Sequence, residues 1–128
     1  MSKIDTVTID TARTWVDVTG INIKEMTVCN TGGVTTNFDF AIGPSSLANG
    51  GSDTGCVYFL KDVKIPVNTT LVLDEDFINN TFSSGMTIFT NAVSGGKTTR
   101  TQMTNPTFLV RLGDTSTDEA VDMIILRR

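Results

Sequence analysis

Apolar and polar residues alternate in short runs along the whole chain, and this two-residue period predicts β-strands. The clearest run is Phe38, Phe40 and Ile42, which share one face of the expected strand. No window of about 11 residues shows a helical period. The segment 118–126 comes nearest to one, but its apolar positions fit a terminal strand better.

Turn signals separate these runs at intervals of about 8–12 residues, a spacing typical of sandwiches and small barrels. Examples are NTGG at 30–33 and the hairpin signal SGGK at 94–97. The sequence therefore predicts an all-β fold, a single-domain antiparallel β-sandwich of jelly-roll or Ig-like type with about eight to nine strands. Residues 15–128 form this domain, and residues 1–14 form either an N-terminal arm or the first strand.

Several segments depart from simple alternation. The apolar period changes phase near Lys24 and Glu25, which predicts a bulge or a strand break. Pro66 has no amide proton and belongs at a sheet edge or a strand end. Cys56–Leu60 is apolar on both faces, so we expect a central strand there. In the strand over 107–112, alternation directs Arg111 outward.

Two segments are candidates for contact with a partner. The stretch Gly43–Gly55 contains four glycines and predicts one long loop, either functional or simply solvated. Thr98–Thr104 is polar on both faces, so this strand is expected to be exposed or to face a partner.

Composition reinforces the β prediction. Thr, Val and Ile together supply 44 of the 128 residues, and their branched side chains suit a pleated, half-buried surface. Ten basic and 14 acidic residues give 10 − 14 = −4, which argues against a nucleic-acid partner. Unbroken apolar runs such as Met123–Leu126 and Cys56–Leu60 are far too short to span a membrane, so no membrane partner is expected. The N-terminal residues lack an apolar targeting segment, and we expect folding in a cytosol.

The usual residues of enzyme sites are scarce. The chain has no histidine, which excludes Ser-His-Asp and Cys-His catalysis and histidine-ligated zinc. Cys29 and Cys56 are too few for a four-thiolate site, and we favour buried reduced thiols over a disulfide. Trp15 and Tyr58 lie in apolar strands and are expected in the core. We therefore expect a protein that is not an enzyme, with no catalytic, cofactor-binding or metal-binding residue.

Two acidic groups are candidates for calcium binding, because carboxylate and amide oxygens are the ligands that calcium prefers. In both cases a solvated acidic turn is favoured, since neither group has the spacing of an EF-hand loop. The first group is Asp74, Glu75, Asp76, Asn79 and Asn80, and the second is Asp114, Asp118, Glu119 and Asp122.

One pair of segments resembles a known family. The strand end Val28-Cys29-Asn30-Thr31-Gly32 is followed, after a strand and a loop, by Ile65-Pro66 and Thr69-Thr70-Leu71-Val72-Leu73. This combination resembles small β-sandwich virion proteins of tailed bacteriophages, found among neck, tail and head-accessory proteins. The resemblance covers about half of the chain and implies a structural role in repeated copies, with no catalytic residues to carry over.

The resemblance and the residues lead to one functional expectation. The protein is expected to be a non-enzymatic structural component of a tailed-phage virion, assembled in the host cytoplasm as a homo-oligomer with other virion proteins. Its expected contact surfaces are Thr98–Thr104, Gly43–Gly55 and the two termini. The alternative is a receptor- or glycan-binding sandwich module on a fibre, which would need exposed aromatic side chains near the loop.

Overall fold

The computed structural model describes residues 3–11, 13–18, 23–49, 55–75, 87–103, 105–113 and 118–127. They form ten β-strands and one short 3-10 helix, and all paired strands are antiparallel. The elements are β1 (Lys3–Ile9), β2 (Val16–Asp17), β3 (Ile23–Asn30), β4 (Thr36–Pro44), the 3-10 helix η2 (Ser45–Asn49), β5 (Val57–Ile65), β6 (Thr70–Leu73), β7 (Phe89–Ser94), β8 (Lys97–Gln102), β9 (Pro106–Leu112) and β10 (Val121–Arg127).

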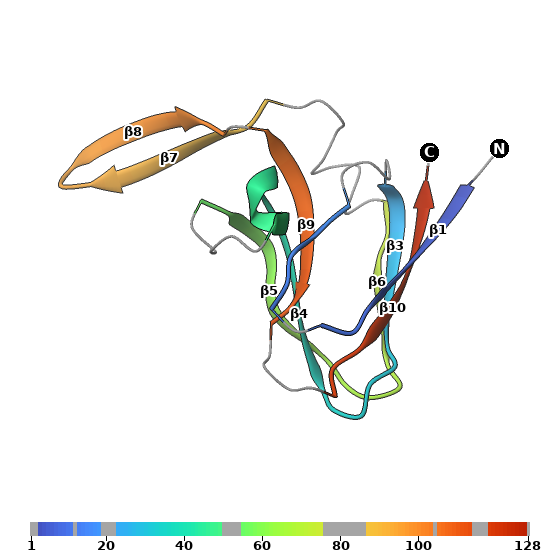
Figure 1. Ribbon diagram of the computed structural model, residues 1–128. Coiled ribbons are helices and arrows are strands. Elements are labelled where there is room, and N and C mark those ends of the chain that lie inside the picture. The colour runs from blue at the N-terminus through green and yellow to red at the C-terminus, as the bar shows by residue number, and fades with distance from the viewer. Residues whose placement is uncertain are drawn as a thin grey trace.

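Eight of the strands form two four-stranded sheets that pack face to face (Figure 1). Sheet A has the order β1-β10-β3-β6, and sheet B has the order β2-β9-β4-β5. If the β7–β8 hairpin is left out and the other eight strands are renumbered in chain order, sheet A has the order 1-8-3-6 and sheet B has the order 2-7-4-5. This order is that of a jelly roll, in which two Greek keys wrap into a double sheet. The prediction of a β-sandwich is confirmed, and its jelly-roll form is the one observed.

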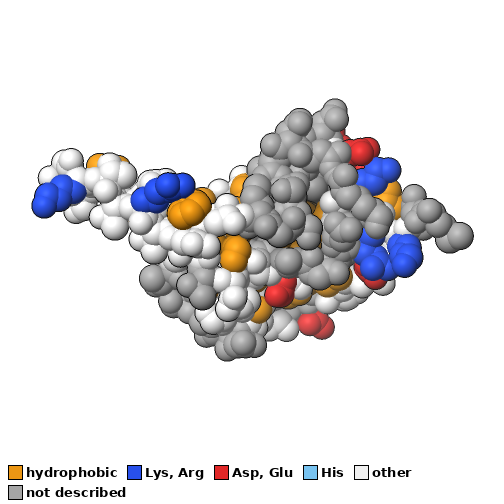
Figure 2. Space-filling view, turned by 90° about the horizontal axis from the view of Figure 1, so that it is seen from above, with side chains coloured by type: hydrophobic (Ala, Val, Ile, Leu, Met, Phe, Trp, Pro, Cys, Tyr) orange, Lys and Arg blue, Asp and Glu red, His pale blue; other side chains and the backbone are white. Residues whose placement is uncertain are grey.

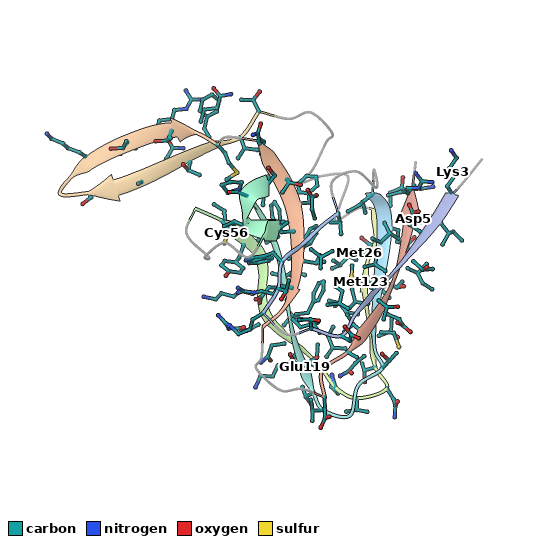
Figure 3. All side chains as sticks on the ribbon, viewed as in Figure 1. Lys3, Asp5, Met26, Cys56, Glu119 and Met123 are labelled. Atoms are coloured by element: carbon teal, nitrogen blue, oxygen red, sulfur yellow. The ribbon has the colours of Figure 1, made fainter. Side chains whose placement is uncertain are left out.

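The core lies between the two sheets and is built from alternate positions of their strands. Met26 and Met123 of sheet A are fully buried there (Figure 3), opposite Phe38 and Phe40 of sheet B. The ring of Phe40 lies 5.5 Å from the ring of Phe59, within the centroid spacing that aromatic pairs prefer. The alternation of Phe38 and Phe40 with polar neighbours therefore predicted the inner face of β4 correctly.

Two local departures from alternation are confirmed. Across sheet A, Leu126 pairs with Glu25 whereas Arg127 pairs with Ile23, so Lys24 is the extra residue of a bulge. Pro66 follows the last residue of β5, a strand end where its missing amide proton costs no ladder hydrogen bond. Ten strands are present instead of the expected eight to nine, with the two-residue β2 among them.

The prediction that Cys56–Leu60 is a central strand is wrong. These residues lead into and begin β5, which is the outer strand of sheet B. The segment is apolar on both faces for another reason. Tyr58 packs on the outside of sheet B, whereas Phe59 and Leu60 pack toward the core between the sheets. Side chains of this edge strand therefore take part in packing on both faces of sheet B.

The expected long loop over Gly43–Gly55 is only partly a loop. Its first residues complete β4, and the next form the 3-10 helix η2, whose Leu47 is buried. Residues 50–54 lie outside the described residues. At the N-terminus, Lys3–Ile9 forms β1, which pairs along its whole length with β10. In the part of the chain that the structure describes, no helix is both long and apolar enough to cross a membrane.

Candidate assembly surfaces

The most distinctive surface is the β7–β8 hairpin, which extends away from the sandwich beyond β9 (Figure 1). Its strands pair from Phe89 with Gln102 to Ser94 with Lys97. The turn consists of Gly95 and Gly96, both with positive φ, as a two-residue type I′ turn requires. Eleven of the twelve strand residues are exposed. A two-stranded ribbon of this kind has marginal stability in water unless something packs on it.

The hairpin differs in charge from the remainder of the chain. Lys97 and Arg100 are its charged residues, so residues 87–103 carry +2 within a chain of net charge −4. Figure 2 shows basic and apolar side chains, without acidic ones, along the visible part of the hairpin. The guanidinium of Arg100 lies 3.8 Å from the centre of the Phe89 ring. Val93, on the same face of the hairpin, is 74% exposed.

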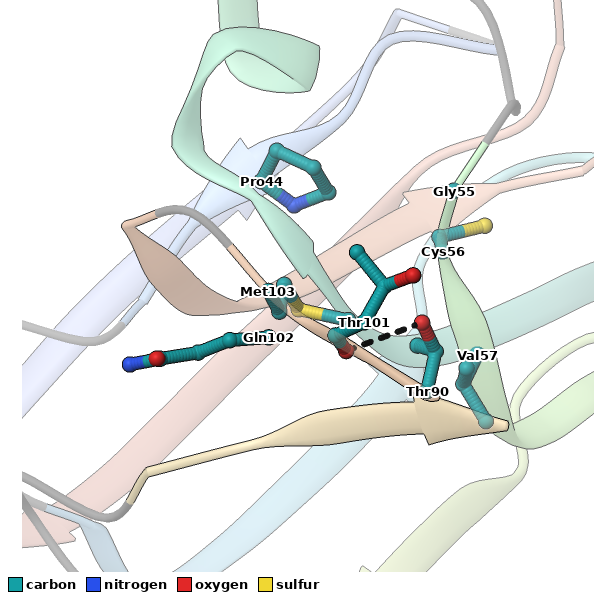
Figure 4. A pocket seen from close by; sticks show the side chains of 8 residues that line it. All are labelled: Pro44, Gly55, Cys56, Val57, Thr90, Thr101, Gln102 and Met103. Carbon is teal, nitrogen blue, oxygen red and sulfur yellow. Dashed lines mark hydrogen bonds between the residues drawn. The ribbon is translucent and has the colours of Figure 1, made fainter. Parts of the chain in front are cut away.

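The base of the hairpin meets the sandwich at an open recess of about 440 Å³ (Figure 4). Pro44 and Val57 line it from the sandwich, and Thr90 and Thr101 line it from the hairpin. The hydroxyl of Thr90 donates a hydrogen bond to the carbonyl oxygen of Thr101 at 3.3 Å. Met103, which follows β8, is buried and also lines the recess. The strand predicted over Thr98–Thr104 is thus exposed from 98 to 102 and buried at Met103. Thr104 lies outside the described residues.

A second candidate surface is the outer face of sheet A. The register places Thr6, Ile124, Thr27 and Val72 in one row across its four strands, all directed away from the core. Ile124 and Val72 are 50% and 53% exposed, and Ile4 on the next row is 63% exposed. Three large apolar side chains therefore lie exposed on one sheet face, among threonines.

The outer face of sheet B is covered instead. Arg111 and Asp39 are paired across β9 and β4, and the Arg111 Nη2 atom lies 3.0 Å from the Asp39 Oδ2 atom. The same nitrogen donates a hydrogen bond to the Tyr58 hydroxyl at 3.1 Å, and Trp15 lies 4.2 Å from the guanidinium. The prediction that Arg111 points outward is correct for the sheet, but the residue is only 4% exposed, because the segment around Trp15 and η2 packs over it.

Only part of each acidic group singled out in the sequence lies within the described residues. Asp74, Glu75, Asp118 and Asp122 are exposed, and Asp76, Asn79, Asn80 and Asp114 lie outside the described residues. Among the residues that the structure describes, no three His, Cys, Asp or Glu side chains are grouped as metal ligands. Glu119 is the exception to the expected solvated turn. It is 1% exposed (Figure 3), and its Oε1 atom accepts a hydrogen bond from the Asn37 amide at 3.3 Å.

The two cysteines are half-buried thiols that are not joined in a disulfide. Cys29 lies in β3 on the outer face of sheet A, paired with Asp122 on one side and Thr70 on the other. Cys56 precedes β5 and packs against the cluster on the outside of sheet B. Of the predicted core aromatics, Trp15 is buried and Tyr58 is half-buried.

The two segments that carry the family resemblance lie side by side. The Asn30 side chain is buried and donates hydrogen bonds to the carbonyl oxygens of Ile65 and Val34, at 2.7 and 2.8 Å. The Asn30 side-chain oxygen accepts the Gly32 amide at 2.9 Å. A Cβ atom on Gly32 would meet the Asp118 carbonyl oxygen at 2.2 Å, so this position requires glycine. The quoted residues therefore form one structural joint between β3, the turn after it and β5.

Comparisons of the chain with protein-family models, with curated proteins and with solved structures find no match.

Proposed function

We propose that this protein is a non-enzymatic structural component of a tailed-bacteriophage virion, an accessory protein of the head, neck or tail. It assembles in multiple copies through its sandwich faces, termini and loops, together with other virion proteins. The observation that carries this proposal is the β7–β8 hairpin, an exposed ribbon that projects from the body (Figure 1). An exposed ribbon of this kind is stabilised when a neighbouring molecule packs on it.

Three further features support the proposal. The jelly roll is a fold common among viral capsid proteins, although it also occurs in lectins and cupins, so it does not define a function by itself. The outer face of sheet A presents Ile4, Val72 and Ile124 to solvent, as a surface that a neighbour covers would. The segments that resemble tailed-phage virion proteins form one joint around Asn30.

The alternative is a receptor- or glycan-binding module, which the jelly roll also permits. Sugar binding usually uses an exposed Trp or Tyr on which a ring can stack. Trp15 is 3% exposed and lies over Arg111, and Tyr58 is half-buried. Within the described residues, Phe89 is the one aromatic side chain among the large apolar residues that are exposed. The structure therefore favours assembly over sugar binding.

The test combines solution mass with particle composition. Light scattering coupled to size exclusion, from low micromolar to near-millimolar protein, is expected to give a defined ring whose copy number matches a virion symmetry axis. Mass spectrometry of phage particles produced from the genome that encodes this chain is expected to detect it in a fixed ratio to the major capsid protein. A monomer at every concentration, together with absence from the particles, would refute the proposal. Binding in a glycan panel would favour the alternative.

A further inference from the structure

We infer that the β7–β8 hairpin of one copy lies across the outer face of sheet A of a second copy. This inference rests on the multi-copy assembly of the proposed function and names the two surfaces that meet. It commits to a second copy of this chain because the two surfaces complement each other in charge, in apolar side chains and in size.

The acceptor face is apolar and acidic. Its outward positions include the exposed Ile4, Val72 and Ile124, and its charged residues are Glu25 and Asp122. Of the basic residues in the same strands, Lys3 and Arg127 are paired with each other at alternate positions of the pleat, and Lys24 is the bulge residue. A ligand for this face therefore needs exposed apolar groups and positive charge.

The hairpin offers both properties. Val93 is 74% exposed and Phe89 is 41% exposed, and both lie on the face that carries Arg100. Lys97 lies beside the turn at the tip, on the opposite face of the ribbon from Arg100, and residues 87–103 contain no acidic side chain. Opposite charges on facing surfaces direct association and fix its register.

The dimensions also agree. Six residues per strand at about 3.4 Å each make the hairpin roughly 20 Å long. Four strands about 4.8 Å apart make sheet A roughly 14 Å wide. One hairpin can therefore cross all four strands of the acceptor.

The contact must form between copies. The hairpin leaves the molecule on the side away from sheet A, so it does not reach the acceptor face of its own chain (Figure 1). A contact between two different surfaces of identical molecules is heterologous, and it closes a ring when the rotation per copy divides a full turn. This property fits the ring expected of a virion accessory protein.

The test is a charge exchange between the two surfaces. The double variant Lys97→Glu/Arg100→Glu makes the hairpin acidic, and Glu25→Lys/Asp122→Lys makes the acceptor basic. Each variant alone is expected to assemble at least about tenfold more weakly than the wild type, because like charges face each other. An equimolar mixture is expected to regain assembly, since each hairpin then meets an acceptor of opposite charge. Light scattering over a dilution series measures both effects.

The matched control is Lys61→Glu/Lys64→Glu, which makes the same change in net charge on the exposed side chains of β5. It is expected to assemble like the wild type. If the hairpin and acceptor variants also assemble like the wild type, or the mixture does not recover, the docking inference is wrong while multi-copy assembly stands. If the wild type is itself monomeric throughout, the docking inference fails, and detection of the protein in phage particles then decides whether the proposed function also fails.

Cross-linking gives a second, independent readout. Cys29 lies on the acceptor face, so Val93→Cys in a Cys56→Ser background is expected to give covalent oligomers with a short bismaleimide. These products should vanish when Cys29→Ser is added. Products that persist without Cys29 would show hairpin-to-hairpin contact and overturn the inference. Val67→Cys, exposed on the turn before β6, is the control that should not cross-link.

Discussion

The outer face of sheet B buries charged side chains, whereas the outer face of sheet A exposes apolar ones. On sheet B, the charged pair of Asp39 and Arg111 is buried beneath Trp15. On sheet A, the apolar Ile124 and Val72 are half exposed. A charged residue is rarely buried unless it is paired, and an exposed apolar group on a sheet face is covered most simply by another molecule. The comparison shows one face that the chain covers itself and one whose apolar side chains stay exposed in the single chain.

The covered face should be the most sensitive to substitution. Arg111→Ala removes one partner of a buried ion pair and leaves Asp39 uncompensated, which is expected to cost about 3–5 kcal/mol of unfolding free energy. Urea denaturation of dilute protein at neutral pH measures this loss. Arg100→Ala on the hairpin is the control, and it should change the free energy by less than about 0.5 kcal/mol. Equal losses for the two variants would contradict the comparison.

The joint between β3 and β5 links the two sheets and should be the next most sensitive. Asn30→Ala leaves the Ile65 and Val34 carbonyl oxygens without this donor and is expected to cost about 2 kcal/mol. Thermal and urea unfolding measure the change. Asn91→Ala, at an exposed position of β7, is the control and should have little effect. A near-neutral Asn30→Ala would mean that the joint does not contribute to the stability of the sandwich.

The outer face of sheet A should tolerate a polar substitution without loss of stability in the monomer. Ile124→Thr is expected to change the unfolding free energy of dilute protein by no more than about 0.5 kcal/mol, and to weaken assembly at high concentration. Ile125→Thr, the next residue of β10, places a hydroxyl in the core and should cost more than about 2 kcal/mol. If Ile124→Thr is as costly as Ile125→Thr, the outer face of sheet A is covered within the monomer.

The smallest effect on global stability is expected at the hairpin turn. Gly96→Val places a β-branched residue at a φ of 78°, which strains the turn. Because the hairpin packs so little on the body, global unfolding should shift by less than about 0.5 kcal/mol. Amide hydrogen exchange in β7 and β8 should accelerate, while exchange in the two sheets stays the same. A large global loss would show that the hairpin is an integral part of the sandwich.

The fold class followed from local signals in the sequence. Alternation at Phe38 and Phe40, the hairpin signal SGGK, and the phase change near Lys24 all report geometry within one strand or one turn. These features are decided by neighbours in the chain, so a single sequence contains them.

The features that the sequence did not predict are decided by segments distant in the chain. Arg111 is buried because the segment around Trp15 crosses the sheet, and Glu119 is buried beside Asn37, 82 positions away. The apolar character of Cys56–Leu60 indicated burial on both faces, but a central strand and a covered edge strand produce the same pattern. The hairpin itself was visible as a polar strand next to a turn signal, whereas its projection from the body was not.

The pairing of β1 with β10 has a mechanical consequence. The two strands are antiparallel, with Lys3 opposite Arg127, so the chain leaves the sandwich twice at the same end (Figure 1). A force that pulls these two ends apart acts across the ladder and loads its hydrogen bonds one after another, as in opening a zipper. The ladder between β1 and β10 is therefore expected to open at low force when the molecule is stretched by these two ends.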